Sequence, residues 1–156
     1  MMRIVGTVLA MLLGSIPAQA GLLDSPPPSF DSGTGQVVYR MGPVYYEAGH
    51  IDTVVTCSNL SDDPVSMAIE IFDEEDTRVR LERGSAAARA DVTFTTSAAP
   101  GIPGAIVVSE LPRIDHGKAR VSATAKTISC TARHRTVAGD GAVSEGPLEL
   151  VKKVAF

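Results

Sequence analysis

The sequence predicts an all-β protein: a two-sheet antiparallel β-sandwich of about eight strands with one disulfide between the sheets. From Gln36 onward, short apolar and β-branched runs are separated by turn residues, which is the pattern of successive strands. Two cysteines, Cys57 and Cys130, fall in the two halves of this region at positions that face inward. The chain shows no heptad pattern and no amphipathic helical stretch of useful length.

The first twenty residues predict an export signal. Met1-Met2-Arg3 is a short cationic start, Ile4 to Ile16 is an apolar run without a charge, and Ala18-Gln19-Ala20 has the small-x-small pattern that signal peptidase recognises. The apolar run is too short to span a bilayer comfortably, and no comparable stretch follows it. We therefore expect a periplasmic or secreted protein with no transmembrane segment after signal removal.

Residues 21–34 predict a flexible leader that precedes one folded domain. The leader is rich in Pro, Ser and Gly, and its triplet Pro26-Pro27-Pro28 excludes helix and offers no backbone donors. Removing the first 20 of the 156 residues leaves 136, which suits a single domain with its own core. Residues 35–156 are therefore assigned to the β-sandwich domain.

The first clear strands lie on either side of an acidic turn. Ile51 to Cys57 alternates inward and outward residues, Val65 to Ile71 does the same, and the turn Asn59 to Pro64 separates them. We expect these two strands to pair as an antiparallel hairpin. Within the turn, Asn59-Leu60-Ser61 matches the N-glycosylation sequon, which matters only in a eukaryotic host.

The remainder of the domain continues the strand pattern. Asp73 to Asp76 predicts a hairpin tip that leads into a strand around Val79 to Leu81, and Gly84 to Asp91 has the composition for about one helical turn. Further strands are expected at Val92–Thr96 and Ala105–Ser109, in the long β-prone stretch Ala119–Ala125 and Thr127–Ala132, and at Leu148–Ala155 after the glycine-rich loop Ala138–Gly146.

The two cysteines predict a structural disulfide. Cys57 shares the inward face of its strand with Val55, and Cys130 shares an inward face with Ile128 and Ala132. An even number of cysteines in an exported chain favours a disulfide over a metal site or a redox pair. Because a cysteine lies in each half of the domain, we expect the bond to join the two sheets.

Two segments resemble those of small exported bacterial immunoglobulin-like sandwich proteins of unassigned function: Val54 to Phe72 and Gly117 to Ala132. The chain departs from true immunoglobulin domains, because it contains no Trp and has Ile128 where a Tyr would precede the second cysteine by two residues. The resemblance implies the sandwich architecture and carries over no activity.

Charge distribution suggests a partner surface. Loss of Arg3 with the signal leaves 13 of the 14 basic residues against 18 acidic ones, a net charge of −5, which argues against non-specific binding to nucleic acid or to an anionic membrane. Residues 62–76 hold seven acids and no base, whereas residues 113–135 hold six bases and one acid. Lys118, Arg120 and Lys126 share strand parity, so we expect them to form an exposed face that binds an acidic protein or an anionic envelope polymer. The alternative is that the two regions pair with each other across neighbouring strands.

No cofactor, metal ion or catalytic residue is predicted. His50, His116 and His134 each lie beside a turn and form no local metal motif. The contiguous acids Asp73 to Asp76 leave calcium binding as an alternative to a solvated hairpin tip, since they lack the alternating spacing of a calcium loop.

These observations predict a non-enzymatic exported β-sandwich with a binding or structural role in the cell envelope or outside the cell. One alternative is a fibre or pilus-type subunit, in which the leader of one chain would add a strand to another chain. The other alternative is a small secreted hydrolase, which requires a convergent polar pocket.

Overall fold

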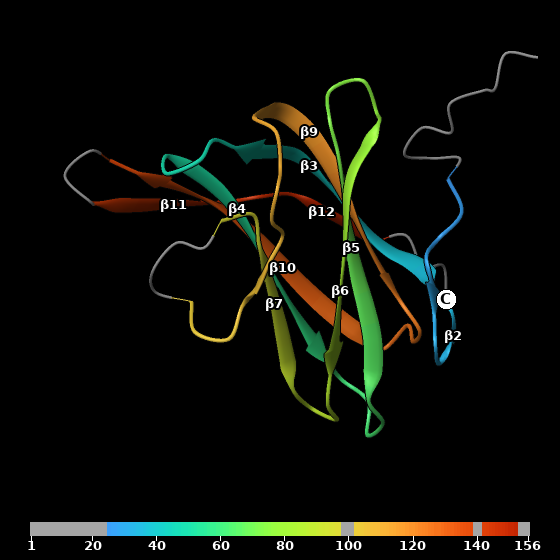
Figure 1. The fold of residues 1–156 in the computed structure, drawn as a ribbon. Helices are drawn as coiled ribbons and strands as arrows, with labels where there is room; N and C mark the ends of the chain where they lie inside the picture. The colour runs from blue at the N-terminus through green and yellow to red at the C-terminus, as the bar shows by residue number, and fades with distance from the viewer. Residues whose placement is uncertain (1–24, 98–101, 139–141, 153–156) are drawn as a thin grey trace, which may run out of the picture.

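The computed structural model describes residues 25–97, 102–138 and 142–152 (Figure 1). The described residues form strands and turns only, so the prediction of an all-β protein is confirmed. This part of the chain has no helix that is long and apolar enough to cross a membrane. The predicted export signal at residues 1–20 lies outside the described residues.

Twelve strands are present in the described residues, of which several are very short. In chain order they are β1 Ser29–Phe30, β2 Gly33–Thr34, β3 Gln36–Tyr46, β4 Ile51–Asn59, β5 Val65–Phe72, β6 Arg78–Ala86, β7 Asp91–Thr95, β8 Ile106–Val107, β9 Ile114–Ala123, β10 Ile128–Val137, β11 Val143–Pro147 and β12 Leu150–Lys152.

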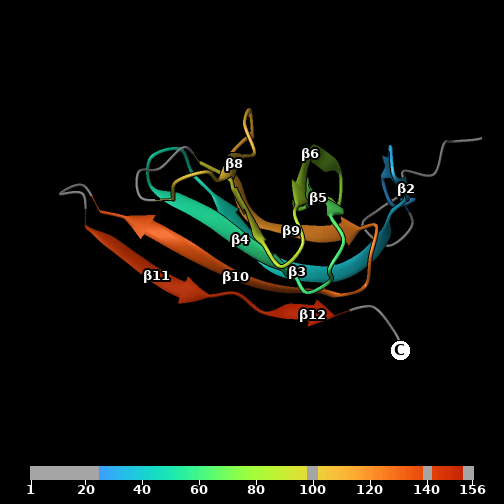
Figure 2. The same ribbon diagram turned by 90° about the horizontal axis from the view of Figure 1, so that it is seen from below.

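Two five-stranded sheets form the body of the domain, which confirms the predicted two-sheet arrangement. One sheet has the order β11-β10-β4-β7-β8 and the other has the order β12-β3-β9-β5-β6. Neighbouring strands are antiparallel except β7 and β8, and β1 and β2 make a separate small hairpin. Consecutive strands β11 and β12 run along one side of the molecule, each in a different sheet (Figure 2).

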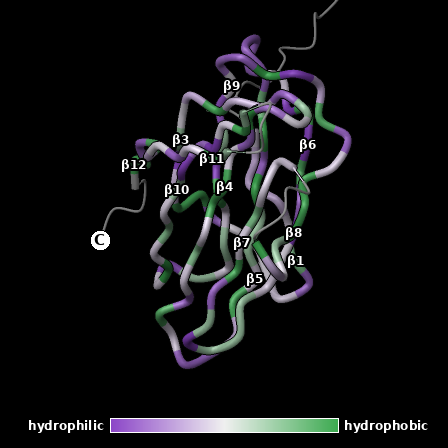
Figure 3. Tube along the Cα trace, turned by 90° about the vertical axis from the view of Figure 1, so that its left-hand side faces the viewer, coloured by the Kyte–Doolittle hydropathy of each residue, from purple (hydrophilic) through white to green (hydrophobic). Residues whose placement is uncertain are grey.

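The core fills the space between the sheets. Alternate residues of each long strand supply it, for example Met67, Ile69 and Ile71 of β5 and Ala119 and Val121 of β9. All five of these side chains are at most 2% exposed. Along the Cα trace, hydrophobic stretches lie on the strands and hydrophilic residues gather at many of the turns (Figure 3).

The predicted hairpin between residues 51–57 and 65–71 is wrong, because β4 and β5 belong to different sheets. The connection between them carries the chain from one sheet to the other. Asn59 is buried at the end of β4, and its side-chain amide donates to the carbonyls of Asp63 (2.7 Å) and Ala87 (2.9 Å). Glycosylation would require an exposed Asn59 side chain. In the structure this side chain is buried and connects the turn at Asp63 with the turn at Ala87.

Two smaller expectations also differ from the structure, and a third is described only in part. Residues 84–91 form no helical turn, since β6 extends to Ala86 through its pairing with Val65, and Arg89 then turns the chain with a φ of 59°. The expected loop at 138–146 contains the start of β11, which pairs with β10. The final expected strand is described only over β12, because residues 153–156 lie outside the described part.

The disulfide between Cys57 and Cys130 is present, but the prediction that it joins the two sheets is wrong. Cys57 on β4 lies directly opposite Cys130 on β10, with a Cα–Cα distance of 4.1 Å. Both strands belong to the same sheet. The inward orientation of both cysteines was correct, since both belong to the buried core, but they enter it from neighbouring strands rather than from facing sheets.

Candidate functional site

The outer face of the β12-β3-β9-β5-β6 sheet, which points away from the core, carries a row of charged side chains. Arg40 of β3 pairs in register with Arg120 of β9, and Arg120 pairs in register with Glu70 of β5. Strand alternation places these residues opposite the core positions Ala119 and Ile69. Like charges on adjacent strands repel, so the row requires a compensating acid.

Glu70 supplies that acid to two arginines. Arg120 donates to both carboxylate oxygens of Glu70, from Nε at 2.5 Å and from Nη2 at 2.9 Å, and Arg78 donates to Oε1 at 2.9 Å. The side chains of Arg120 and Glu70 are 1% and 0% exposed. The Arg120 guanidinium also lies over the ring of Phe72, 5.5 Å from its centroid, where cation–π attraction adds to the ion pair.

The described end of the leader covers this ion pair. Arg120 donates from Nη1 to the carbonyl of Ser25 (2.8 Å) and from Nη2 to that of Pro26 (2.9 Å). The amide of Gly35 then donates to the carbonyl of Pro28 at 3.2 Å, and β1 and β2 form a hairpin between them. Residues 25–35 are therefore bound to the outer face of their own sheet.

The expectation that Lys118, Arg120 and Lys126 share an exposed face is wrong. Arg120 is buried under the leader, and Lys118 forms an ion pair with Asp76 at 2.7 Å. Lys126 is exposed in the turn between β9 and β10. The sequence left open the alternative that the basic and acidic regions pair with each other. The ion pairs of Lys118 and Arg120 agree with that alternative. A direct role of these residues in binding stays a prediction.

Among the Lys and Arg side chains that the structure describes, three have no acidic partner: Arg40, Arg83 and Lys126. Arg83 is exposed on the edge strand β6, and it makes no hydrogen bond to any described residue. Arg78 and Arg80 of the same strand are paired, with Glu70 and with Glu110 respectively. Arg83 is thus the arginine of β6 whose charge is uncompensated.

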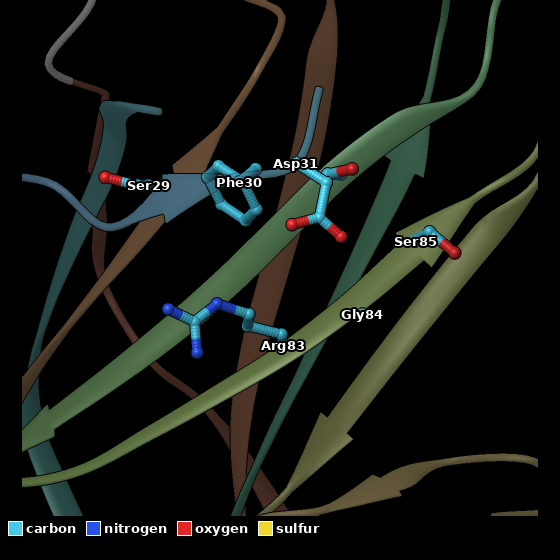
Figure 4. A pocket seen from close by; sticks show the side chains of 7 residues that line it. Ser29, Phe30, Asp31, Arg83, Gly84 and Ser85 are labelled. Carbon is cyan, nitrogen blue, oxygen red and sulfur yellow. The ribbon is translucent and has the colours of Figure 1, made fainter. Parts of the chain in front are cut away.

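A groove of about 510 Å³ lies beside Arg83, between the β1–β2 hairpin and the end of β6. Phe30 and Asp31 form one side, and Arg83 and Ser85 form the other, with Ser66 of β5 also in the lining (Figure 4). Asp31 forms no ion pair or hydrogen bond with another described residue. The groove therefore combines an aromatic ring, three serine hydroxyls, and a carboxylate and a guanidinium that have no partner among the described residues.

The sequence did not predict the side of the groove that Phe30 and Asp31 form, because residues 21–34 were expected to be a flexible leader. A local signal was present, since Asp31-Ser32-Gly33 is a turn-forming triplet and Gly33 has a φ of 134°, a conformation that glycine adopts without strain. The position of the hairpin over β5 depends on a contact distant in sequence. Ser32 Oγ lies 3.2 Å from Ser66 Oγ.

The acidic run Asp73 to Asp76 is the tip of the β5–β6 hairpin, as predicted. Asp73 Oδ1 accepts from the amides of Glu75 (3.1 Å) and Thr77 (2.8 Å), which fixes the turn. Glu74 Oε1 reaches β9 and accepts from the amides of Asp115 and His116 at 2.6 and 3.1 Å. These two backbone hydrogen bonds lower the pKa of Glu74 below its usual value.

The structure brings together two of the three histidines. The ring centroid of Tyr45 lies 5.5 Å from that of His116 and 6.3 Å from that of His134, both edge to face. His50 lies apart from this pair in the exposed turn between β3 and β4. Among the residues that the structure describes, no three His, Cys, Asp or Glu side chains are grouped so as to hold a metal ion.

A second buried ion pair lies on the other sheet. Arg135 of β10 donates to Asp52 of β4 from Nε at 2.9 Å and from Nη2 at 2.6 Å, and the hydroxyl of Ser97 donates to the same carboxylate at 2.7 Å. Hydrogen bonding to Asp52 raises the pKa of Arg135. Because the Asp52 carboxylate accepts from both Arg135 and Ser97, we assign this cluster a structural role in joining β4 and β10.

No protein-family model, no curated protein and no solved structure matches this chain.

Proposed function

We propose that this protein is an exported, immunoglobulin-like β-sandwich that acts by binding a partner and performs no catalysis. The observation that carries the proposal is the groove between the β1–β2 hairpin and β6, in which Arg83 and Asp31 are both without a partner in the described structure. A charged side chain that serves only stability is normally solvated singly or paired, whereas two uncommitted opposite charges in one concavity favour ligand recognition.

The export part of the proposal rests on residues 1–20 and on the disulfide. Disulfides form and persist outside the cytoplasm, so the Cys57–Cys130 bond supports a periplasmic or secreted location. Salt sensitivity is expected of the partner interaction, since exposed charges such as Arg83 are screened at physiological ionic strength.

The leader contacts favour a binding domain over a fibre subunit. A donor segment must leave its own domain to add a strand to another chain. Here the described leader is held by Arg120, by the Gly35–Pro28 hydrogen bond and by its own hairpin. Donation would break these contacts and expose the Arg120–Glu70 pair.

The experiment has two steps. Bacterial cells that produce the full chain are fractionated, and the exported protein is expected to begin at Gly21 by intact mass and to contain no free thiol.

The purified protein is then immobilised, and envelope extracts are passed over it, over a Ser85→Trp variant that fills the groove, and over a Ser129→Trp variant on the exposed surface of β10 as a matched control. Retention of one component by the wild type and by the Ser129 variant, but not by the Ser85 variant, would support the proposal. Equal retention by all three proteins, or full-length protein confined to the cytoplasm, would contradict it.

A further inference from the structure

The free edge of β6 adjoins the groove. Among the described strands, β6 is the last of its sheet and pairs with β5 alone. The other edge strands are shorter: β6 spans nine residues, against five for β11, three for β12 and two for β8. An edge strand leaves alternate backbone amides and carbonyls without a ladder partner, so an edge of this length can accept another strand.

A second copy of this chain is a poor occupant of that edge. If two β6 strands paired antiparallel with Arg83 of one copy opposite Arg78 or Arg80 of the other, arginines would face arginines across the pair. Like charges opposite one another destabilise a strand pair. Arginines on an edge strand therefore discourage self-association while leaving the edge open to a strand of complementary charge.

The outer face of β6 defines what that complementary strand must carry. Alternation places Leu81, Arg83 and Ser85 on this face, since Leu81 pairs in register with Glu70 and Ser85 with Ser66. Leu81 is half-buried and Arg83 has no partner in the described structure. Asp31, also unpartnered, lies over the Ser85 end of the groove (Figure 4).

We propose that β6 binds an extended segment of a partner polypeptide as an added antiparallel strand, with the side-chain pattern basic-x-acidic-x-apolar. The basic residue lies opposite Ser85 and contacts Asp31, the acidic residue lies opposite Arg83, and the apolar residue lies opposite Leu81. Backbone hydrogen bonds to β6 supply affinity, and the two charges fix register and direction. This inference rests on the proposed binding function and names its partner class.

The test uses a synthetic heptapeptide, TKTETVT, blocked at both ends and fluorescently labelled, with binding to the exported protein followed by polarisation. The control peptide TETKTVT has the same composition and exchanges the two charges. We expect saturable binding of the first peptide and weaker binding of the second, because the exchange places like charges together at both Asp31 and Arg83. Equal affinity for the two peptides would overturn the proposed register.

Two protein variants separate the groove from general charge effects. Arg83→Gln is expected to weaken binding of TKTETVT about three- to fivefold, the loss typical of one exposed ion pair. Arg89→Gln is the matched control, since Arg89 is an exposed arginine in the turn after β6 and pairs with Asp62 away from the groove. A loss of affinity equal in the two variants would contradict a specific role of Arg83.

Backbone methylation tests strand addition itself. One version of TKTETVT carries N-methyl groups on its Lys, Glu and Val residues, and the other carries them on the internal Thr residues. Only one of these two sets of amides faces β6, so one methylated peptide should lose binding and the other should keep it. Equal binding or equal loss would overturn strand addition. If no peptide binds while the Ser85→Trp variant still loses its envelope component, the strand-addition proposal fails and the binding function stands.

Discussion

Arg120 and Glu70 form a buried ion pair on adjacent strands of the outer sheet face, joined by two hydrogen bonds of 2.5 and 2.9 Å. The pair has two further connections: Arg78 shares the Glu70 carboxylate, and Arg120 holds the carbonyls of Ser25 and Pro26. The same guanidinium thus compensates a buried acid and fastens the leader. Stability of the sheet and placement of the β1–β2 hairpin over the groove are therefore linked.

Removal of Glu70 alone should lower the free energy of unfolding more than removal of both Glu70 and Arg120. Glu70→Leu leaves the buried Arg120 without an anion, and we expect a loss of about 3–5 kcal/mol in the free energy of unfolding. Glu70→Leu combined with Arg120→Met removes both charges and should be less destabilising than Glu70→Leu alone. Urea unfolding of these two variants and of Arg120→Met alone measures the three losses that the comparison needs. Additive losses would show that the two residues do not act as a pair.

Loss of the Arg120 side chain should also release the leader. Arg120→Met removes both donors to the carbonyls of Ser25 and Pro26, so hydrogen exchange of amides in residues 29–35 should become faster than in the wild type. Arg89→Gln, which removes an ion pair with Asp62 and no described contact of the leader, is the control and should leave these amides unchanged. Unaltered exchange in the Arg120 variant would show that the hairpin is held without it.

The disulfide should stabilise the domain substantially, although it lies within one sheet. It links Cys57 to Cys130, which lie 73 positions apart in the sequence. Replacement of both cysteines by alanine is expected to lower the free energy of unfolding by about 2–5 kcal/mol. Chemical reduction of the wild type should give the same loss. A variant as stable as the oxidised wild type would contradict this, and peptide mapping without reductant checks the linkage directly.

The strands could be predicted from sequence because alternation is a local property. Ile51 to Cys57 and Val65 to Ile71 alternate visibly, and both are strands. Their pairing partners could not be predicted in the same way. The turn between them is short enough for a hairpin, and only the buried amide of Asn59, which bonds to Asp63 and Ala87, marks the crossing between sheets.

The candidate site shows the same division between local and distant information. Strand parity correctly placed Arg120 on the face away from the core, but parity carries no information about what covers that face. The covering segment comes from residues 25–28, nearly a hundred positions earlier in the chain. Arg83 could not be recognised from sequence, because its lack of a partner among the described residues depends on where every nearby acid lies.

Asn59 should contribute to stability through its donors. Asn59→Ala leaves the carbonyls of Asp63 and Ala87 without this partner, and we expect a loss of about 1–3 kcal/mol in the free energy of unfolding. Asn59→Asp keeps the acceptor oxygen that Ser61 uses but removes the amide donor, so it should be similarly destabilising. Ser61→Ala, which retains the Asn59 amide donor, should lower the free energy of unfolding by less. Thermal unfolding ranks the three variants, and an aspartate variant as stable as the wild type would contradict the role of the donor.

Glu74 should make the contact between the β5–β6 tip and β9 depend on pH. Its carboxylate accepts hydrogen bonds from the amides of Asp115 and His116, which lower its pKa in the folded protein. A group whose pKa is lower in the folded than in the unfolded state stabilises the fold above its unfolded pKa and loses that effect as pH falls through its folded pKa. The contact should therefore weaken only in acid.

The amide proton shifts of residues 115 and 116, followed by NMR from pH 7 to pH 2, test this expectation. We expect both amides to move together with a midpoint below the usual range of a glutamate, because both hydrogen bonds end on the same carboxylate oxygen. The neighbouring Asp115 carboxylate, which pairs with Arg113, is removed as a contributor by Asp115→Asn. Glu74→Gln should abolish the common transition, and Glu75→Gln at the adjacent exposed position should leave it intact. A transition that survives in the Glu74 variant would assign it to another group and would show that the tip of the hairpin is held to β9 without this carboxylate.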